Sequence, residues 1–331
     1  MTVVRRAYAR AGLLGNPSDG YFGKTISITV GNFSSSVTLS ESPDLRIQPQ
    51  DLDLDVFSDI DHLVKSVSRQ GYYGGARLVK AAIKKFSDHC FEKGINLESR
   101  NFAVRYTSSI PRQVGLAGSS AIVTAMMRAL MDFYEVDIPD HILPNLILSA
   151  EVDELGITAG LQDRVIQVLE GCVYMDFSKD VMTESGHGSY EHIDPSLLPD
   201  LFVAYRTEPE KVSGRVLNDL RTRFEEGDAE VISTLERIAQ LAEEGREAIL
   251  NQDTGEFSRL MDENFDLRST IMKISETSSE MIKRARGCGA SAKFTGSGGA
   301  IIGLLEDDTM FRKLADELES LGARLIRPQV I

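Results

Sequence analysis

The sequence predicts an α+β protein built of two domains. The chain has 331 residues, about twice the roughly 150 residues typical of one domain. Segments with the two-residue alternation of strands and segments with helical spacing occur in both halves of the chain. Between the halves, the polar stretch 185–199 contains two glycines and two prolines. We therefore expect a first domain at 1–190 and a second at 191–331, each containing strands and helices.

The first half begins with two expected strands, at 3–14 and 25–39, separated by the glycine-rich stretch "GLLGNPSDGYFG". In the second strand, Ile26, Ile28 and Val30 alternate with polar residues, which is typical of a strand with one buried face. The same patterns predict a helix at 69–93, a strand at 102–107, helices at 121–134 and 142–154, and a strand at 171–177.

The second half begins with an expected strand at 201–205, which precedes a mainly helical region. Helical spacing and boundary residues predict helices at 229–251, 256–273 and 276–286. A strand "SAKF", a loop "TGSGG" and a strand "AIIGLL" follow, and the chain closes with an expected helix at 308–321. Because the glycines of "TGSGG" lead into a strand, they do not form a dinucleotide-binding fingerprint, which opens a helix.

Composition limits the possible partners. Fifty acidic residues against 36 basic ones give a net charge of −14, which argues against a nucleic acid or a membrane surface as the partner. No apolar run reaches the roughly 18 residues of a membrane-spanning helix. The three cysteines are widely spaced without a metal-ligand pattern, so we expect free thiols in a reducing compartment, the cytoplasm.

The stretch "SSIPRQVGLAGSSA" at 108–121 joins an expected strand to a buried, apolar helix. Gly115 and Gly118 allow the backbone to approach a ligand closely, and the free N–H groups of a helix start favour an anion. Ser119 and Ser120 stand at that helix start. Their alternative role is to cap the helix, which serine does routinely. The residues alone leave both roles open.

Four segments together resemble the GHMP kinases, the family of galactokinase, homoserine kinase and mevalonate kinase. "IPRQVGLAGSSA" is similar to the second family signature, P-x-x-x-G-L-G-S-S-A, with Ala117 as one extra residue. "ARAGLLGNPSDGYFG" resembles the first signature, "GASAKFTGSGGAIIGL" the third, and "AEVDELGITAGLQDRV" the segment with the magnesium-binding and catalytic acids. The resemblance implies an N-terminal ribosomal protein S5 domain 2-like domain and a C-terminal ferredoxin-like domain.

The resemblance also implies ATP and Mg²⁺ as cofactors and assigns roles to individual residues. Asp163 matches the catalytic base, Arg10 the cation beside it, and Ser120 and Glu151 the magnesium ligands. The implied ATP-binding residues belong to the second and third signatures: Pro111, Gly115, Leu116, Ala117, Gly118, Ser119, Ser120, Ala121, Gly296, Ser297, Gly298 and Gly299. The alternatives are a solvated loop acid for Asp163 and a surface arginine for Arg10.

Substrate contacts are expected from the first signature and from two arginines. Asp19 resembles the acid that accepts hydrogen bonds from sugar hydroxyls, whereas Asn16 departs from the "GEHTD" wording of galactokinase and argues against galactose. For a substrate carboxylate, Arg268 in "NFDLR" is the leading candidate and Arg164 the reserve, because a guanidinium can grip both carboxylate oxygens. The alternative for Arg268 is a surface ion pair with neighbouring acids.

Within the family, the wording of the first two signatures and of "NFDLR" is most similar to the glucuronokinase type. This resemblance implies phosphorylation of the anomeric hydroxyl of a small sugar acid, D-glucuronate. The alternatives are a sugar kinase of the arabinokinase or heptose phosphate kinase type, a decarboxylase of the superfamily, or a nucleotide-binding protein without turnover. Tyr72 or Tyr73, in the "GYYGG" stretch at the entrance of the expected helix at 69–93, is a candidate to enclose adenine. The sequence gives no indication of the oligomeric state.

Overall fold

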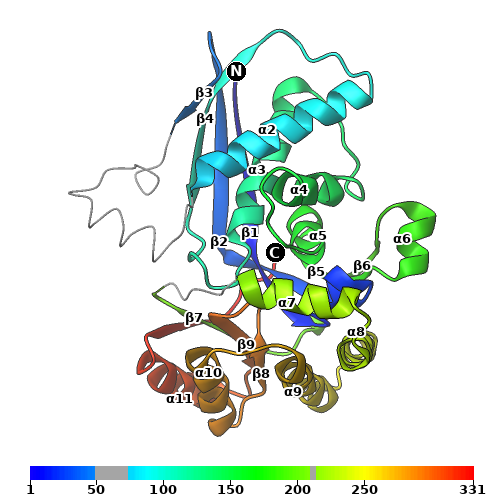
Figure 1. Cartoon of the computed structure of the whole chain (residues 1–331). Helices are drawn as coiled ribbons and strands as arrows, with labels where there is room; N and C mark the ends of the chain where they lie inside the picture. Colours follow the sequence, from blue (N-terminus) through cyan, green and yellow to red (C-terminus); the bar gives the residue numbers. More distant parts are fainter. Residues whose placement is uncertain (49–73, 209–213) are drawn as a thin grey trace, which may run out of the picture.

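The computed structural model describes residues 1–48, 74–208 and 214–331 (Figure 1). Tyr72 and Tyr73, the candidates for adenine contact, lie outside this part of the chain. A first sheet has the strand order β3-β4-β2-β5-β6, with β1 paired to β2. All its pairings are antiparallel except β3 with β4. Its strands are β1 (Thr2–Leu14), β2 (Lys24–Ser42), β3 (Arg46–Gln48), β4 (Asn101–Ser108), β5 (Cys172–Asp176) and β6 (Ser189–Ile193).

The long strand β2 organises the first sheet, because one half of it pairs with β5 and the other half with β4. The 3₁₀ helix η1 (Ser18–Tyr21) lies between β1 and β2. Helix α3 is apolar almost all round and is buried between α2, α4 and the sheet, as expected for such a sequence (Figure 1). The helices of this part are α2 (Gly75–Glu92), α3 (Gly118–Tyr134), α4 (Leu143–Val152), α5 (Gln162–Leu169) and α6 (Lys179–Ser185).

A second sheet has the antiparallel order β10-β7-β9-β8. Numbered along the chain, this is the order 4-1-3-2 of a ferredoxin-like sheet, which confirms the expected fold class. Its strands are β7 (Leu201–Arg206), β8 (Ala292–Phe294), β9 (Ala300–Leu304) and β10 (Ala323–Ile326). The helices of this part are α7 (Gly214–Glu225), α8 (Ala229–Leu250), α9 (Thr254–Ile271), α10 (Glu276–Gly287) and α11 (Asp308–Glu319), and the short η3 (Pro195–Leu197) precedes β7.

The predicted elements in the described residues are present, and several short ones were missed. The missed elements are β3, α5, α6, β6, α7 and β10. Strand β6 pairs with β5, so the change from one sheet to the other falls between Ile193 and Leu201, a segment that overlaps the polar stretch at 185–199. The domain boundary at 190 stays a prediction.

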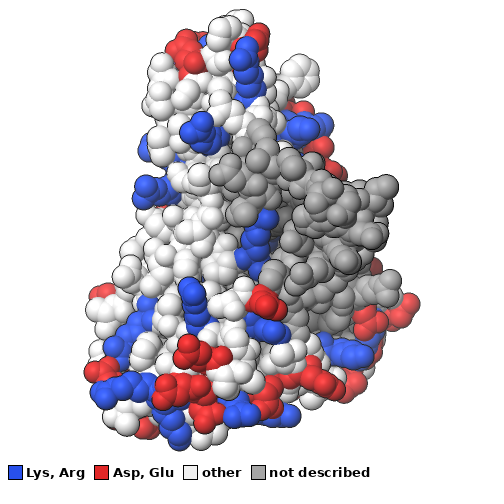
Figure 2. Space-filling model, turned by 90° about the vertical axis from the view of Figure 1, so that its left-hand side faces the viewer, with Lys and Arg blue, Asp and Glu red and all other residues white. Residues whose placement is uncertain are grey.

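The surface carries both signs of charge. Over the lower part of the face in Figure 2, lysine and arginine side chains are interspersed with aspartate and glutamate. Exposed pairs such as Arg284 with Glu317, 2.8 Å apart, each contribute little to stability in water. Of the described helices, none has both the length and the apolar character needed to cross a bilayer.

Candidate active site

A cavity of about 330 Å³ lies where the three glycine-containing signatures meet. Its walls come from the end of β1, from η1, from the loop before α3, from the turn into α5, from α9 and from the β8–β9 loop. The walls contact one another directly: Gly12 N donates to Thr295 O over 2.8 Å, and Arg10 N donates to Leu116 O over 3.2 Å. Segments far apart in the sequence therefore form one site.

Most of the residues singled out from the sequence line this cavity. They are Arg10, Asn16, Asp19, Pro111, Gly115, Leu116, Ala117, Gly118, Ser119, Asp163, Arg164, Arg268, Gly296 and Ser297. The others are buried behind its wall: Ser120, Ala121, Glu151, Gly298 and Gly299. The fold thus brings the whole set to one region, although the individual roles stay predictions.

The loop before α3 is packed against the β8–β9 loop. Gly115 has φ +73°, and a Cβ there would lie 2.8 Å from Gly298 O, so this position requires glycine. Ala117 adopts φ 59°, a left-handed conformation unusual for alanine. Gln167 Nε2 donates to Ala117 O over 2.9 Å and steadies this turn. No side chain caps α3, so the serine-capping alternative is wrong and the first N–H groups are available to an anion.

Gly118→Val tests the loop. Gly118 has no positive φ, and an added Cβ would meet only Ile110 at an ordinary 3.4 Å, so the backbone should tolerate valine. A branched side chain over the helix start should nevertheless keep phosphates away from the N–H groups. We expect the Kd for ATP to rise by about tenfold or more, equivalent to about 1.4 kcal/mol. Calorimetric titration of ATP checks this, with thermal unfolding as a test of folding.

Gly255→Val is the matched control, because Gly255 lies in the first turn of α9, away from the cavity, and an added Cβ would meet only Asp253 at 3.6 Å. Its ATP affinity should stay at the wild-type value. A folded Gly118→Val protein with unchanged ATP affinity would remove the loop from the nucleotide site.

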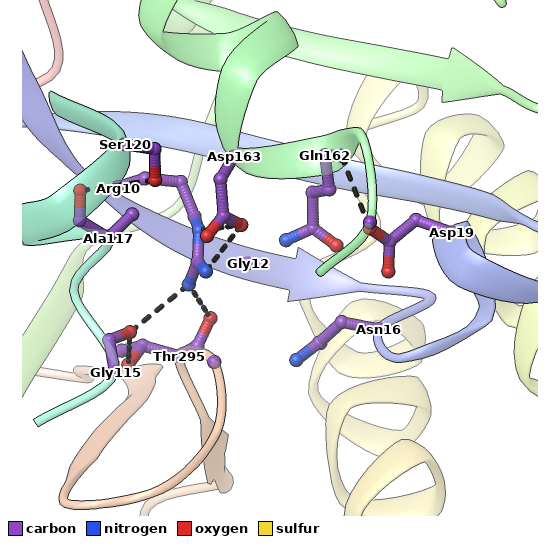
Figure 3. A network of polar contacts seen from close by, with 12 residues as sticks. Arg10, Gly12, Asn16, Asp19, Gly115, Ala117, Ser120, Gln162, Asp163 and Thr295 are labelled. Atoms are coloured by element: carbon purple, nitrogen blue, oxygen red, sulfur yellow. Dashed lines mark hydrogen bonds and ion pairs between the residues drawn. The ribbon is translucent and has the colours of Figure 1, made fainter. Parts of the chain in front are cut away.

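Asp163 and Arg10 form the centre of a polar network (Figure 3). Asp163 lies in the first turn of α5, and its Oδ1 accepts from Arg10 Nε over 2.9 Å and from Arg10 Nη2 over 2.5 Å. Arg10 Nη1 also donates to Gly115 O and Thr295 O, over 3.1 and 2.6 Å. Arg10 is 5% exposed, so the surface-arginine alternative is wrong. Asp163 Oδ2 makes no hydrogen bond to the described residues and lies 3.6 Å from Arg164 Nη1, an ion pair that leaves its hydrogen-bonding positions open.

Arg164, which lines the cavity, forms a buried ion pair with Glu151, which lies behind the cavity wall. Arg164 Nε and Nη2 both donate to Glu151 Oε2, the former over 2.8 Å. Among the described residues, Glu151 Oε1 has no hydrogen-bond partner although it is buried, which is rare for a carboxylate oxygen. Ser120 Oγ makes only a 3.5 Å contact, with Ala117 O. A hydroxyl and an unpartnered carboxylate oxygen suit a hard cation, so these residues fit Mg²⁺ chemically.

Asp19, on η1, accepts from Gln162 N over 3.2 Å. Burial and the negative charge of Asp163 raise the pKa of Asp19 from 3.8 to about 6, against the opposing effect of Arg10 and Arg164. Because the folded value exceeds the unfolded one, the stability that protonated Asp19 contributes is present below about pH 4 and is lost as the pH rises through about 6. At neutral pH, Asp19 is an ionised acceptor in the cavity.

This titration predicts a pH dependence of acceptor use. As the pH falls through about 6, Asp19 gains a proton and loses acceptor capacity for sugar hydroxyls, so KM for the sugar should rise. The pH profile of kcat/KM at saturating ATP measures this effect. Asp19→Asn should lower activity at pH 7 and flatten the acidic limb of the profile. Asp140→Asn, at an exposed position away from the cavity, should leave the activity and the acidic limb as in the wild-type protein. An unchanged acidic limb in Asp19→Asn would show that another group titrates there.

Arg268 is a buried cation on α9. It is 3% exposed, Nη1 donates to Gly296 O over 2.7 Å, and the guanidinium carbon lies 5.3 Å from the centre of the Phe294 ring. Nε has no hydrogen-bond partner. Burial, together with the positive charge of Arg10, lowers the pKa of Arg268 to about 10. Arg268 is therefore charged at neutral pH, and the described residues use only part of its hydrogen-bonding capacity.

The surface ion-pair alternative for Arg268 is wrong. The acids near it in sequence are paired elsewhere: Asp262 and Asp266 with Arg286, and Glu263 with Arg237 and Arg259. Within the described part of the chain, no carboxylate lies within 4.0 Å of the Arg268 nitrogens. A buried charge without a partner is costly, and a bound anion would remove that cost.

Three residues of the site were not singled out from the sequence. Lys293, Asn264 and Gln162 are each at most 2% exposed. Asn264 Oδ1 accepts from Gly15 N over 2.9 Å, and Asn264 Nδ2 donates to Asn16 O over 3.2 Å, so α9 holds the first-signature loop. The available signal was a polar residue inside a buried pattern, such as the lysine of "SAKF" within an apolar strand.

Comparisons with known proteins identify the family from the sequence and the shared fold from solved structures. Residues 77–171 match the model for the GHMP kinases N terminal domain, and residues 246–324 match the GHMP kinases C terminal model. The chain is 47% identical to Glucuronokinase 1 of Arabidopsis thaliana over 95% of its own length and 88% of that protein. It is 24% identical to mevalonate kinase of Pyrococcus furiosus, over 90% of this chain and 87% of that protein.

Among solved structures, Lactococcus lactis galactokinase complexed with galactose superposes with a TM-score of 0.79 at 15% identity, over 99% of this chain and 93% of that one. Streptococcus pneumoniae phosphomevalonate kinase has a TM-score of 0.76 at 16% identity, over 100% of both chains. These likenesses concern the fold alone, whereas the family follows from the sequence matches. The chain belongs to the GHMP kinase family.

Proposed function

We propose that this protein is an ATP-dependent kinase that phosphorylates the anomeric hydroxyl of a sugar acid, D-glucuronate, to give glucuronate 1-phosphate. The observation that carries the proposal is that Arg268, a buried guanidinium with no acidic partner in the described part of the chain, lines the same cavity as the Asp163–Arg10 pair. A substrate carboxylate would form an ion pair with Arg268, and a substrate hydroxyl would donate a hydrogen bond to Asp163. The 47% identity to the plant glucuronokinase supports the same substrate.

Each group of cavity residues has a separate role in the proposed reaction. Asp163 Oδ2 accepts the proton of the attacking hydroxyl, and Arg10 holds the carboxylate through Oδ1. The backbone N–H groups at the start of α3 bind phosphate oxygens, and the Gly296–Ser297 loop lies against Gly115 beside them. Mg²⁺, held by Ser120 and Glu151 Oε1, would screen the phosphate charge. Positioning and charge stabilisation then account for most of the catalysis.

The local charge of the cavity favours an anionic acceptor over a neutral sugar. A protein with a net charge of −14 repels a carboxylate at long range, so a local cation is needed to hold it. Arg268 supplies that cation, and Asn16 replaces the acidic residue of the galactokinase wording. A neutral pentose would leave Arg268 uncompensated, and for that reason we rank the arabinokinase type second.

Steady-state kinetics with a panel of acceptors tests the proposal. The purified protein is assayed for ADP release with ATP and Mg²⁺, using D-glucuronate, D-galactose, L-arabinose and a heptose 7-phosphate. We expect kcat/KM for glucuronate to exceed that for each of the others by at least about tenfold. Preference for a neutral sugar would contradict the sugar-acid assignment, and ATP binding without ADP release under any condition would favour the non-catalytic alternative.

The cofactor and the location are part of the proposal. Removal of Mg²⁺ with EDTA should abolish ADP release, and added Mg²⁺ should restore it, because the charge of ATP is then screened again. A cytoplasmic location is supported by three cysteines that are all free thiols, two of them buried.

A further inference from the structure

Lys293 is a buried lysine whose three hydrogen bonds all go to oxygen atoms. Its Nζ donates to Gly12 O over 2.9 Å, to Asn16 Oδ1 over 2.5 Å and to Phe294 O over 2.9 Å. The residue is 2% exposed and lies on β8, so it connects the second sheet to the end of β1 and the loop after it. Among the described residues, no carboxylate lies within ion-pair distance of Nζ.

These contacts match the ammonium form of the amine. The carbonyl oxygens of Gly12 and Phe294 can only accept, and with Asn16 Oδ1 as the third acceptor only the ammonium form has enough N–H groups to give. Burial, with the positive charges of Arg268 and Arg10, lowers the pKa of Lys293 well below 10.5. The protein therefore retains a charge that burial disfavours, at a place where Asn16 supplies its only side-chain hydrogen bond within residues 1–48, 74–208 and 214–331.

The same contacts fix the orientation of the Asn16 amide. An ammonium cannot donate to an NH₂ group, so the oxygen of Asn16 must face Lys293 and the nitrogen must point the other way. Asn16 Nδ2 donates to no described residue, and Asn16 lines the cavity. Figure 3 shows this nitrogen pointing toward the side of Arg10 and Thr295.

We propose that Lys293 is a positioning residue for the acceptor sugar: its ammonium group holds the Asn16 amide so that Nδ2 is a dedicated donor to an oxygen of the substrate. Asn16 Nδ2 and the Arg268 guanidinium then present donors to one cavity, while Asp19 and Asp163 present acceptors to it. Without Lys293 the amide is free to rotate and to offer its oxygen instead. This inference rests on the proposed kinase function, and it specifies which substrate atoms the site selects.

Asn16→Asp separates positioning from structural support. The carboxylate keeps the contact with Lys293 Nζ and adds an opposite charge, so the melting temperature should stay equal or rise. The cavity loses its donor and gains an acceptor, so KM for the acceptor sugar should rise by about tenfold or more. KM for ATP should remain within about twofold, because the nucleotide loop is unchanged.

Lys293→Met complements this variant, with a side chain of similar length and no charge. We expect KM for the sugar to rise by about tenfold, with the ATP KM near the wild-type value. In the double variant Asn16→Asp/Lys293→Met, the two increases in sugar KM should not add, because both arise from the loss of the same Lys293–Asn16 arrangement. Lys84→Met removes an exposed lysine of α2 and should leave both KM values unchanged.

Two results would overturn the inference: an Asn16→Asp protein with wild-type sugar KM, or a Lys293→Met protein that loses melting temperature and kcat while the sugar KM is unchanged. If Lys293→Met does not fold, the melting temperature and sugar KM of Asn16→Asp decide the question together. All variants are assayed with the sugar that the wild-type protein uses best. A wild-type preference for another sugar would therefore contradict the glucuronate assignment and still leave Lys293 testable.

Discussion

Replacing Asp163 by asparagine is expected to lower kcat by about 10²–10⁴-fold, the range typical of general-base catalysis. Asparagine keeps the shape of the side chain, and its oxygen can still accept from Arg10 Nε and Nη2, as Asp163 Oδ1 does. Its nitrogen then takes the place of Oδ2 and cannot accept the proton of the sugar hydroxyl. Single-turnover kinetics at saturating ATP and sugar measure the chemical step.

Asp176→Asn is the matched control. Asp176 has the same 20% side-chain exposure as Asp163 and also lies near a cation, Lys24, at 3.5 Å, but it does not line the cavity. Its substitution should leave kcat near wild type. ATP affinity should be retained in both variants. A loss below about tenfold in Asp163→Asn would mean that Asp163 orients the sugar without accepting its proton.

Arg268→Leu should weaken the use of glucuronate by about 1.5–3 kcal/mol in kcat/KM, the range for a hydrogen bond to a charged group. Leucine fills part of the space but offers neither charge nor donors to the substrate carboxylate. Neutral sugars should lose far less, so the preference for glucuronate should shrink. The measurement is kcat/KM for glucuronate and for galactose, each at saturating ATP.

Arg259→Leu removes the same charge from the same helix, where Arg259 is exposed and paired with Glu256 and Glu263. Arg259→Leu should change neither kcat/KM for glucuronate nor kcat/KM for galactose. Because Arg268 also donates to Gly296 O, the Kd for ATP is measured in both variants to show whether the glycine loop has moved. An equal loss for charged and neutral sugars would assign Arg268 to the support of that loop.

Local patterns predicted much of the fold. The long apolar helix α3 and strands β1 and β2 follow from periodicity, since their buried faces repeat along many residues. Short edge elements such as β3 and β10 were missed, because three or four residues carry little periodic signal. Helix α5 was missed as well: it has only 8 residues and begins in the segment that was interpreted through its catalytic resemblance.

The sequence predicted which residues belong to the site better than it predicted the contacts between them. The resemblance assigned Arg10 and Asp163 to the site, the need for a cation beside a substrate carboxylate added Arg268, and all three line the cavity. No local signal could show that Glu151 would be paired with Arg164, which depends on how α4 packs against α5. Nor could one show that Lys293 would contact Asn16, because that contact depends on how the second sheet packs against the loop after β1. Burial also excluded the surface ion pair that the sequence neighbours of Arg268 suggested.

The most direct test of the central claim is the structure of the product. The protein is incubated with ATP, Mg²⁺ and D-glucuronate, and the product is examined by ³¹P and ¹H NMR. We predict a single phosphomonoester whose phosphorus couples to the anomeric proton of the sugar, formed in equal amount to ADP. A phosphorus coupled to any other ring proton, or ADP formed without a phosphorylated sugar, would contradict the account.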